Sequence, residues 1–119
     1  MFPFRNILFP TDFSAHSHAA LKYAAGFARD FNGRVLLLNV QDAKVPANLL
    51  TLPAYVFEDQ ENQWLLDLRA KARDLIADPL LAGVEVDPVF VEGDRAQEIA
   101  RVAFENEVDL ITVVTRGRN

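Results

Sequence analysis

Four short apolar runs are spaced along the 119-residue chain, and longer segments of mixed character separate them. In the first, second and fourth runs the apolar residues follow one another instead of alternating with polar ones, which is typical of β-strands buried on both faces. The runs therefore predict four strands, at residues 6–10, 34–40, 84–91 and 109–115.

Three segments between the runs repeat apolar side chains at intervals of three and four residues, as amphipathic helices do. The expected buried stripes are Ala20, Tyr23, Ala24, Phe27, Ala28 and Phe31 in the first; Leu65, Leu68, Ala72, Leu75 and Ile76, with Trp64 beside them, in the second; and Ala96, Ile99, Ala100 and Ala103 in the third. We assign Trp64 and the phenylalanines to the core, because aromatic rings are core residues far more often than cofactor stackers.

The ends of these helices carry recognisable signals. Ser14 and Asp94 are expected N-caps, since their side-chain oxygens can accept hydrogen bonds from the first turn. Asn32 and Gly33 supply the left-handed conformation that commonly ends a helix. Residues 41–57 have no clear period and predict a long connection.

Strands that alternate with helices predict an α/β fold, a three-layer doubly wound parallel sheet with helices on both faces. Pro88 lacks the N–H that an inner strand needs, so its strand is expected at an edge. Half of the 119 residues are apolar or aromatic, which suits a single domain over residues 1–119.

In such sheets, ligands bind beyond the carboxyl ends of the strands, where the strand order reverses. Polar and turn residues follow two of the predicted strands, at residues 10–12 and 116–118, and both segments face one crevice if those strands are neighbours. Asp12 is the first candidate, since its carboxylate can accept hydrogen bonds from ribose hydroxyls. It fits equally well as a carboxylate near the start of the next helix.

Charge and composition exclude several classes of function. The chain has 12 Lys and Arg against 17 Asp and Glu, a formal charge of -5, so no broad basic surface is available for a nucleic acid. The lack of cysteine excludes disulfides and thiolate metal sites and suits a cytoplasmic protein. No run approaches the ~20 apolar residues needed to span a membrane.

Two histidines invite a catalytic or metal-binding interpretation. His16 and His18 are two residues apart on a predicted helix, where they point in different directions, and no ligand cluster accompanies them. We assign both to a solvated helix face. A trio of Ser14, His16 and Asp12 fails because adjacency in sequence does not align a nucleophile, a base and an orienting group. We predict no catalytic and no metal-binding residue, and an enzyme is not the preferred interpretation.

A resemblance to the universal stress protein family rests on three segments: NILFPTDFSAHSHAALKYAAGFA, RVLLLNV and VEGDRAQEIARVAFENEVDLITVVTRGRN. Together they extend over nearly the whole chain, whereas residues 41–80 match only in length and helix placement. The resemblance implies five parallel strands and a fold that is commonly homodimeric. Combined with the edge position of Pro88, it predicts the order 3-2-1-4 for the four strands present.

Some members of that family bind ATP, with Mg²⁺, and others bind no nucleotide. For the binding members, the resemblance places Asp12 against the nucleoside, the Val40 backbone against adenine, and Gly117 first in a glycine-rich phosphate loop. The nucleotide-binding residues that it implies are Pro10, Thr11, Asp12, Val40, Arg116 and Gly117.

The sequence also departs from the family pattern. It carries Val114 where the family usually has glycine and Arg116 where histidine is frequent, and it ends before the second loop glycine. We therefore expect a C-terminally incomplete domain without the last helix and fifth strand. As a lone glycine, Gly117 fits an unravelled terminus better than a complete phosphate loop.

Three functions are compatible with these observations. The preferred one is a stress-response and signalling module that binds an adenine nucleotide without rapid catalysis. The second is a nucleotide-free dimeric interaction protein of the same fold, because an open apolar edge at residues 109–115 invites pairing with another strand. The least favoured is a slow nucleotide hydrolase that uses Asp12.

Overall fold

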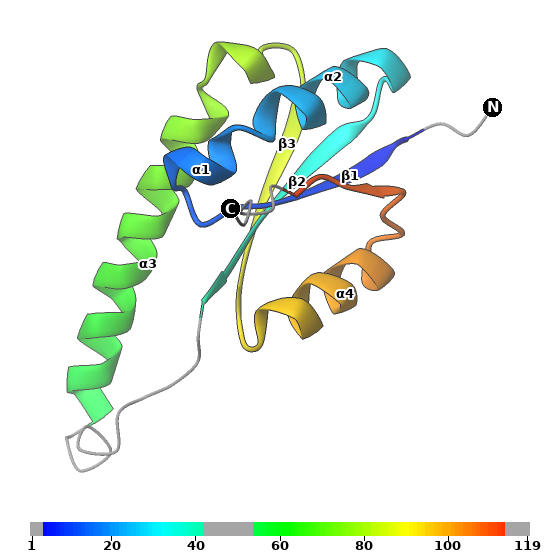
Figure 1. Cartoon of the computed structure of the whole chain (residues 1–119). Coiled ribbons are helices and arrows are strands. Elements are labelled where there is room, and N and C mark those ends of the chain that lie inside the picture. The colour runs from blue at the N-terminus through cyan, green and yellow to red at the C-terminus, as the bar shows by residue number, and fades with distance from the viewer. Residues whose placement is uncertain (1–3, 42–53, 114–119) are drawn as a thin grey trace, which may run out of the picture.

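The computed structural model describes residues 4–41 and 54–113 of the chain. Its elements are β1 (Asn6–Pro10), α1 (Ala15–His18), α2 (Leu21–Phe31), β2 (Arg34–Gln41), α3 (Ala54–Ile76), the 3₁₀ helix η2 (Pro79–Leu81), β3 (Glu85–Glu92), α4 (Arg95–Glu105) and β4 (Leu110–Ile111). They form the predicted α/β architecture, in which helices cover both faces of a parallel sheet (Figure 1).

The sheet has the order β3-β2-β1-β4, and every neighbouring pair is parallel. This confirms the predicted order and places β3, with its Pro88, beside β2 alone. In the described part of the fourth predicted strand, residues 109–113, only Leu110–Ile111 are paired as a strand. Residues 114 and 115 lie outside the described part of the chain.

Each face of the sheet carries its own hydrophobic core. The core under α2 and α3 is built on Ile7, Phe9, Val35 and Leu37, and the core under α4 on Leu8, Leu36 and Leu38. These strand residues are between 0 and 2% exposed. The continuous apolar runs thus arise because alternate residues of β1 and β2 enter different cores.

The helix predicted after the first strand is divided into α1 and α2. Ser14 is the N-cap, as predicted, and its Oγ accepts from the Ser17 N–H at 3.1 Å. The predicted stripe is wrong at Tyr23 and Phe27, which are 57% and 36% exposed. Small side chains allow α2 to lie close to the sheet, and the residues that it buries are Leu21, Ala24, Ala25 and Ala28.

Helix α4 is also turned relative to its predicted stripe. Val102 is buried and Ile99 half-buried, whereas Ala96 and Ala100 are exposed, contrary to the prediction. The larger branched side chains occupy the space over the sheet because they remove more apolar area from water than alanine does. Phe104 is 86% exposed, so its assignment to the core is wrong as well.

The second predicted helix, α3, begins earlier than expected. It starts at Ala54, inside the connection predicted at residues 41–57, so that only residues 42–53 separate it from β2, and these lie outside the described residues. Leu68 and Ala72 are buried as predicted. The side chain of Trp64 lies outside what the structure describes.

A tight backbone contact lies between α2 and β2. Asn32 ends α2 in the left-handed conformation, with φ 54°, as predicted. The next residue, Gly33, must lack a side chain for a different reason. A Cβ there would overlap the carbonyl oxygen of Phe4 and come within 2.8 Å of that of Arg5. The amino end of β1 can approach this turn because residue 33 is glycine.

We expect Gly33→Ala to lower the free energy of unfolding by roughly 1–3 kcal/mol, because the added methyl forces the backbone of residues 4 and 5 to move. Gly26→Ala is the matched control. Gly26 lies within α2, and apart from the adjacent residues and backbone of its own helix no atom lies within 4 Å of the place that an added methyl group would take, so this substitution should raise stability by up to about 1 kcal/mol. Urea unfolding followed by circular dichroism measures both, and equal effects would contradict the contact.

Candidate functional site

The turn that follows β1 is anchored by the buried side chain of Thr11. Its Oγ1 accepts from the Phe13 N–H at 2.9 Å and lies 2.7 Å from the Ser17 hydroxyl. Its backbone N–H donates to the Leu38 carbonyl at 2.8 Å, and its own carbonyl accepts from the Asn39 side chain at 2.9 Å. These backbone hydrogen bonds to β2 fix the position of Thr11, where the chain leaves the sheet.

Asp12 is the exposed carboxylate of this turn. Its Oδ1 accepts from the Ser14 N–H at 2.9 Å. Hydrogen bonding from the Ser14 hydroxyl, and next from the Ser14 backbone, lowers the pKa of Asp12 from 3.8 to about 2. The carboxylate is thus ionised at neutral pH and held in position by the turn.

Strain accompanies the same turn. Phe13 has φ 65°, a left-handed conformation that is uncommon for a bulky residue. The hydrogen bonds on both sides of it, from its own N–H to Thr11 and from the next N–H to Asp12, hold the backbone there. The sequence gives no signal for this conformation, since Phe is not a residue that favours it.

The predicted site residues are partly brought together. Pro10 is the last residue of β1 and pairs with Leu38 of β2, so Asp12 and Val40 each lie two residues beyond this pair, at the same carboxyl edge. Thr11 is buried beneath them. The other two predicted residues, Arg116 and Gly117, lie outside the described part of the chain.

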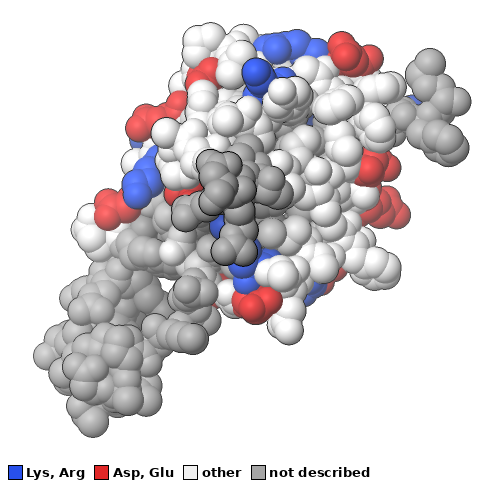
Figure 2. All heavy atoms as spheres, in the orientation of Figure 1, with Lys and Arg blue, Asp and Glu red and all other residues white. Residues whose placement is uncertain are grey.

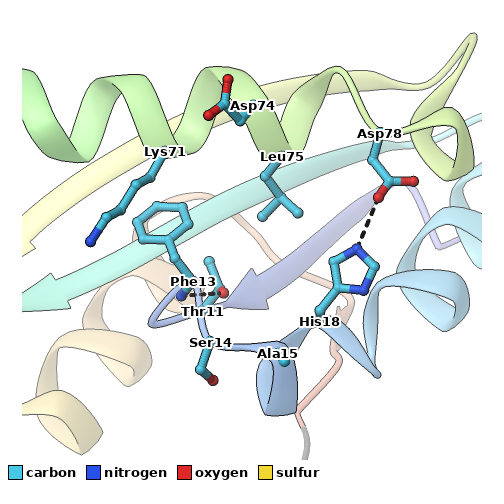
Figure 3. Close-up of a pocket in the computed structure, with 9 residues that line it drawn as sticks. All are labelled: Thr11, Phe13, Ser14, Ala15, His18, Lys71, Asp74, Leu75 and Asp78. Carbon is cyan, nitrogen blue, oxygen red and sulfur yellow. Dashed lines mark hydrogen bonds and ion pairs between the residues drawn. The ribbon is translucent and has the colours of Figure 1, made fainter.

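A pocket of about 400 Å³ opens beside the turn, on the side covered by α3 (Figure 3). Phe13 and Leu75 give it an apolar wall, and Lys71 extends toward the end occupied by Phe13. Of the predicted nucleotide-binding residues that the structure describes, Thr11 alone lines it. The described residues that line it are Thr11, Phe13, Ser14, Ala15, His18, Lys71, Asp74, Leu75 and Asp78.

A hydrogen bond lies at one end of this pocket and adds a contact that the prediction for His18 did not include. His18 Nε2 lies 2.9 Å from Asp78 Oδ2, which links α1 to the residue that caps η2 (Figure 3). The Leu80 N–H and then His18 hold the pKa of Asp78 below its usual value. His18 therefore makes a tertiary contact, whereas His16 lies on an exposed face as expected.

Asn39 is a site residue that sequence reasoning missed. It is only 1% exposed in β2, where its amide nitrogen donates to Thr11 and its oxygen accepts from Gln41 Nε2 at 2.6 Å. A polar residue inside the run RVLLLNV was the available signal, because a buried amide must find partners.

Ser14, His16 and Asp12 are not arranged as a nucleophile, a base and an orienting group. Ser14 Oγ accepts from a backbone N–H, and Asp12 accepts from Ser14 instead of orienting a histidine, so the rejected trio does not form. Residues 4–41 and 54–113 contain no group of three His, Asp or Glu that could hold a metal ion. None of the helices in these ranges is long and apolar enough to cross a bilayer. Figure 2 shows basic and acidic side chains interspersed on the visible part of one face.

The lowered pKa of Asp12 predicts a pH dependence of stability. The group contributes stability above its unfolded value of 3.8, and this contribution is lost as the pH falls toward about 2. Asp12→Asn keeps an acceptor oxygen but cannot titrate. We therefore expect the free energy of unfolding to fall less steeply across this interval in the variant than in the wild type. Urea titrations at several pH values measure the slopes, and identical slopes would contradict the assignment.

Comparisons with known proteins agree with this fold. The family model described as the universal stress protein family matches residues 3–119. No curated protein is similar enough to count as a match.

Three solved structures illustrate the likeness. The hypothetical protein MJ0577 is 25% identical, with a TM-score of 0.78 over 98% of this chain and 78% of that one. A universal stress protein in complex with cAMP is 18% identical, with a TM-score of 0.68 over 94% and 73%. A family protein from Arabidopsis thaliana with AMP bound is 16% identical, with a TM-score of 0.55 over 95% and 77%. Because the family model matches nearly the entire chain and the fold agrees, the chain belongs to the universal stress protein family.

Proposed function

We propose that this chain binds an adenine nucleotide at the carboxyl edge of its sheet and acts as a stress-response and signalling module without rapid catalysis. The observation that carries the proposal is the position of Asp12. The chain runs from β1 to β2 and β3 on one side and places β4 on the other, so the strand order reverses beside β1. Ligands of open α/β sheets bind at this switch point, and Asp12 lies directly beyond it.

The chemistry of Asp12 suits the nucleoside part of such a ligand. With a pKa of about 2 it is an obligate acceptor at neutral pH, and ribose hydroxyls are donors. The backbone of Val40, at the same edge, is proposed to meet the adenine. The proposed binding residues are Pro10, Thr11, Asp12, Val40, Arg116 and Gly117. Two family structures with cAMP and AMP support the ligand class, and ATP with Mg²⁺ is our proposed form of it in the cytoplasm.

We expect Asp12→Ala to weaken the binding of AMP, cAMP and ATP roughly tenfold or more, because a hydrogen bond to a charged group is lost. Isothermal titration calorimetry measures the affinities, with Mg²⁺ present for ATP. Asp30→Ala is the control, since Asp30 is exposed near the carboxyl end of α2, where the chain returns to the opposite edge of the sheet. Tight binding that survives Asp12→Ala would contradict the proposed site.

A second candidate function is a nucleotide-free interaction protein that acts as a homodimer. The observation that favours it is a group of exposed apolar side chains around α4 and β4. Phe104, Ile111 and Val113 are 86%, 41% and 52% exposed, and Ile111 pairs with Leu8, which faces the α4 core. A second chain that covered this edge would remove these side chains from water and pair the outer side of β4.

The oligomeric state tests this candidate directly. We expect sedimentation velocity at low micromolar concentration to show a dimer, and Phe104→Ser together with Val113→Ser to shift it toward monomer. Tyr23→Ser is the control, because Tyr23 is also exposed but lies on α2, over the other face of the sheet. A clean monomer of the unmodified chain without aggregation would contradict the dimer.

A further inference from the structure

A second groove lies between α3 and the edge strand β3, and among the described residues it shares no lining residue with the pocket beside Thr11. Its volume is about 430 Å³, within the range of small-molecule sites. The floor is apolar, and the charged residues among its described lining are two arginines. The described lining consists of Arg69, Ala72, Arg73, Ile76, Pro88 and Phe90.

The apolar floor is only partly covered. Ala72 is buried against the sheet at 2% exposure, whereas Ile76 and Phe90 are half-buried and Pro88 is exposed. Ile76 and Phe90 belong to the rim of the core between the sheet and α2 and α3, so the groove is an open margin of that core. An apolar ligand placed here would bury surface that the fold leaves in contact with water.

The two arginines lie four residues apart on α3, where like charges repel each other. The residues three and four positions away from Arg69 and Arg73 include no carboxylate that could compensate. Arg101 on α4 shows the contrast, because it bonds Glu98 and Glu105 at those spacings, at 2.6 and 2.9 Å. The helix dipole favours Arg73 in the last turn but does not extend to Arg69, one turn earlier.

The edge strand itself argues against an added β-strand as the occupant. Pro88 lies at the centre of Glu85–Glu92 and supplies no N–H, which interrupts the row of donors that an incoming strand would need. A compact molecule that binds beside the strand does not need this row of backbone donors. The groove therefore suits a ligand of side-chain size more than an extended peptide.

We propose that this groove binds a small amphipathic anion, with its carboxylate or phosphate between Arg69 and Arg73 and its apolar body on Ile76, Pro88 and Phe90. Both arginines line the groove, a guanidinium group matches the geometry of such oxyanions, and the ring of Phe90 offers a surface for a flat body. In a chain with a formal charge of -5, this helix face concentrates positive charge next to an apolar surface. The proposal is independent of the nucleotide site.

Naphthoate is a suitable probe, because it joins a carboxylate to a flat apolar body. We expect its titration into the isotopically labelled chain to shift the NMR amide signals of residues 69–76 and 88–90. Naphthamide, which is neutral and of the same shape, should bind about tenfold more weakly or worse, since it loses the charge-assisted hydrogen bonds.

The double variant Arg69→Gln with Arg73→Gln should lower the affinity for naphthoate to that for naphthamide. Glutamine removes both charges and keeps a high helix propensity. Arg101→Gln removes an arginine from α4 and should leave the affinity unchanged. Equal affinity for naphthoate and naphthamide would overturn the proposal. So would unchanged binding by the double variant, or shifts confined to the Thr11 pocket or spread over α4.

Discussion

Strand β1 is enclosed on both edges and both faces, and the remaining structure is arranged around this enclosure. β2 and β4 pair with its edges, while Ile7 and Phe9 enter one core and Leu8 the other, all at 0% exposure. A strand buried in this way can present groups to a ligand only at its ends. The hydrogen bonds of the Thr11 backbone to β2 then fix where the chain leaves the sheet, and Asp12 follows at once.

The same enclosure explains why β1 and β2 could be predicted from the sequence, whereas the helix faces could not. Burial on both sides requires continuous apolar runs, as in these two strands. The strand order depended instead on Pro88 and on the family resemblance. The spacing of apolar residues predicts that a helix exists. It does not determine which face is buried when the candidate face consists mainly of alanine. Ala96 and Ala100 fit an exposed face as well as a buried one, and so the predicted stripe of α4 included them and left out Val102.

The local part of the site was predictable for a similar reason. Ser14 as an N-cap and Asp12 at a strand end depend only on neighbouring residues. The pairing of His18 with Asp78 spans 60 residues and exists because η2 returns beside α1, which no short pattern encodes. Polar contacts that join distant segments require the packed arrangement first, and periodicity does not supply it.

The charge of Asp12 also constrains how a nucleotide can lie in the proposed site. An ionised carboxylate attracts hydroxyl donors and repels phosphates, and the formal charge of -5 adds to that repulsion. The ribose must therefore be the part nearest Asp12, with the phosphates directed away from the end of β1. In the proposed site, phosphate contacts would therefore have to come from a strand end other than that of β1, such as that of its neighbour β4. Under this proposal, selectivity at Asp12 would depend on the sugar, not on the number of phosphates.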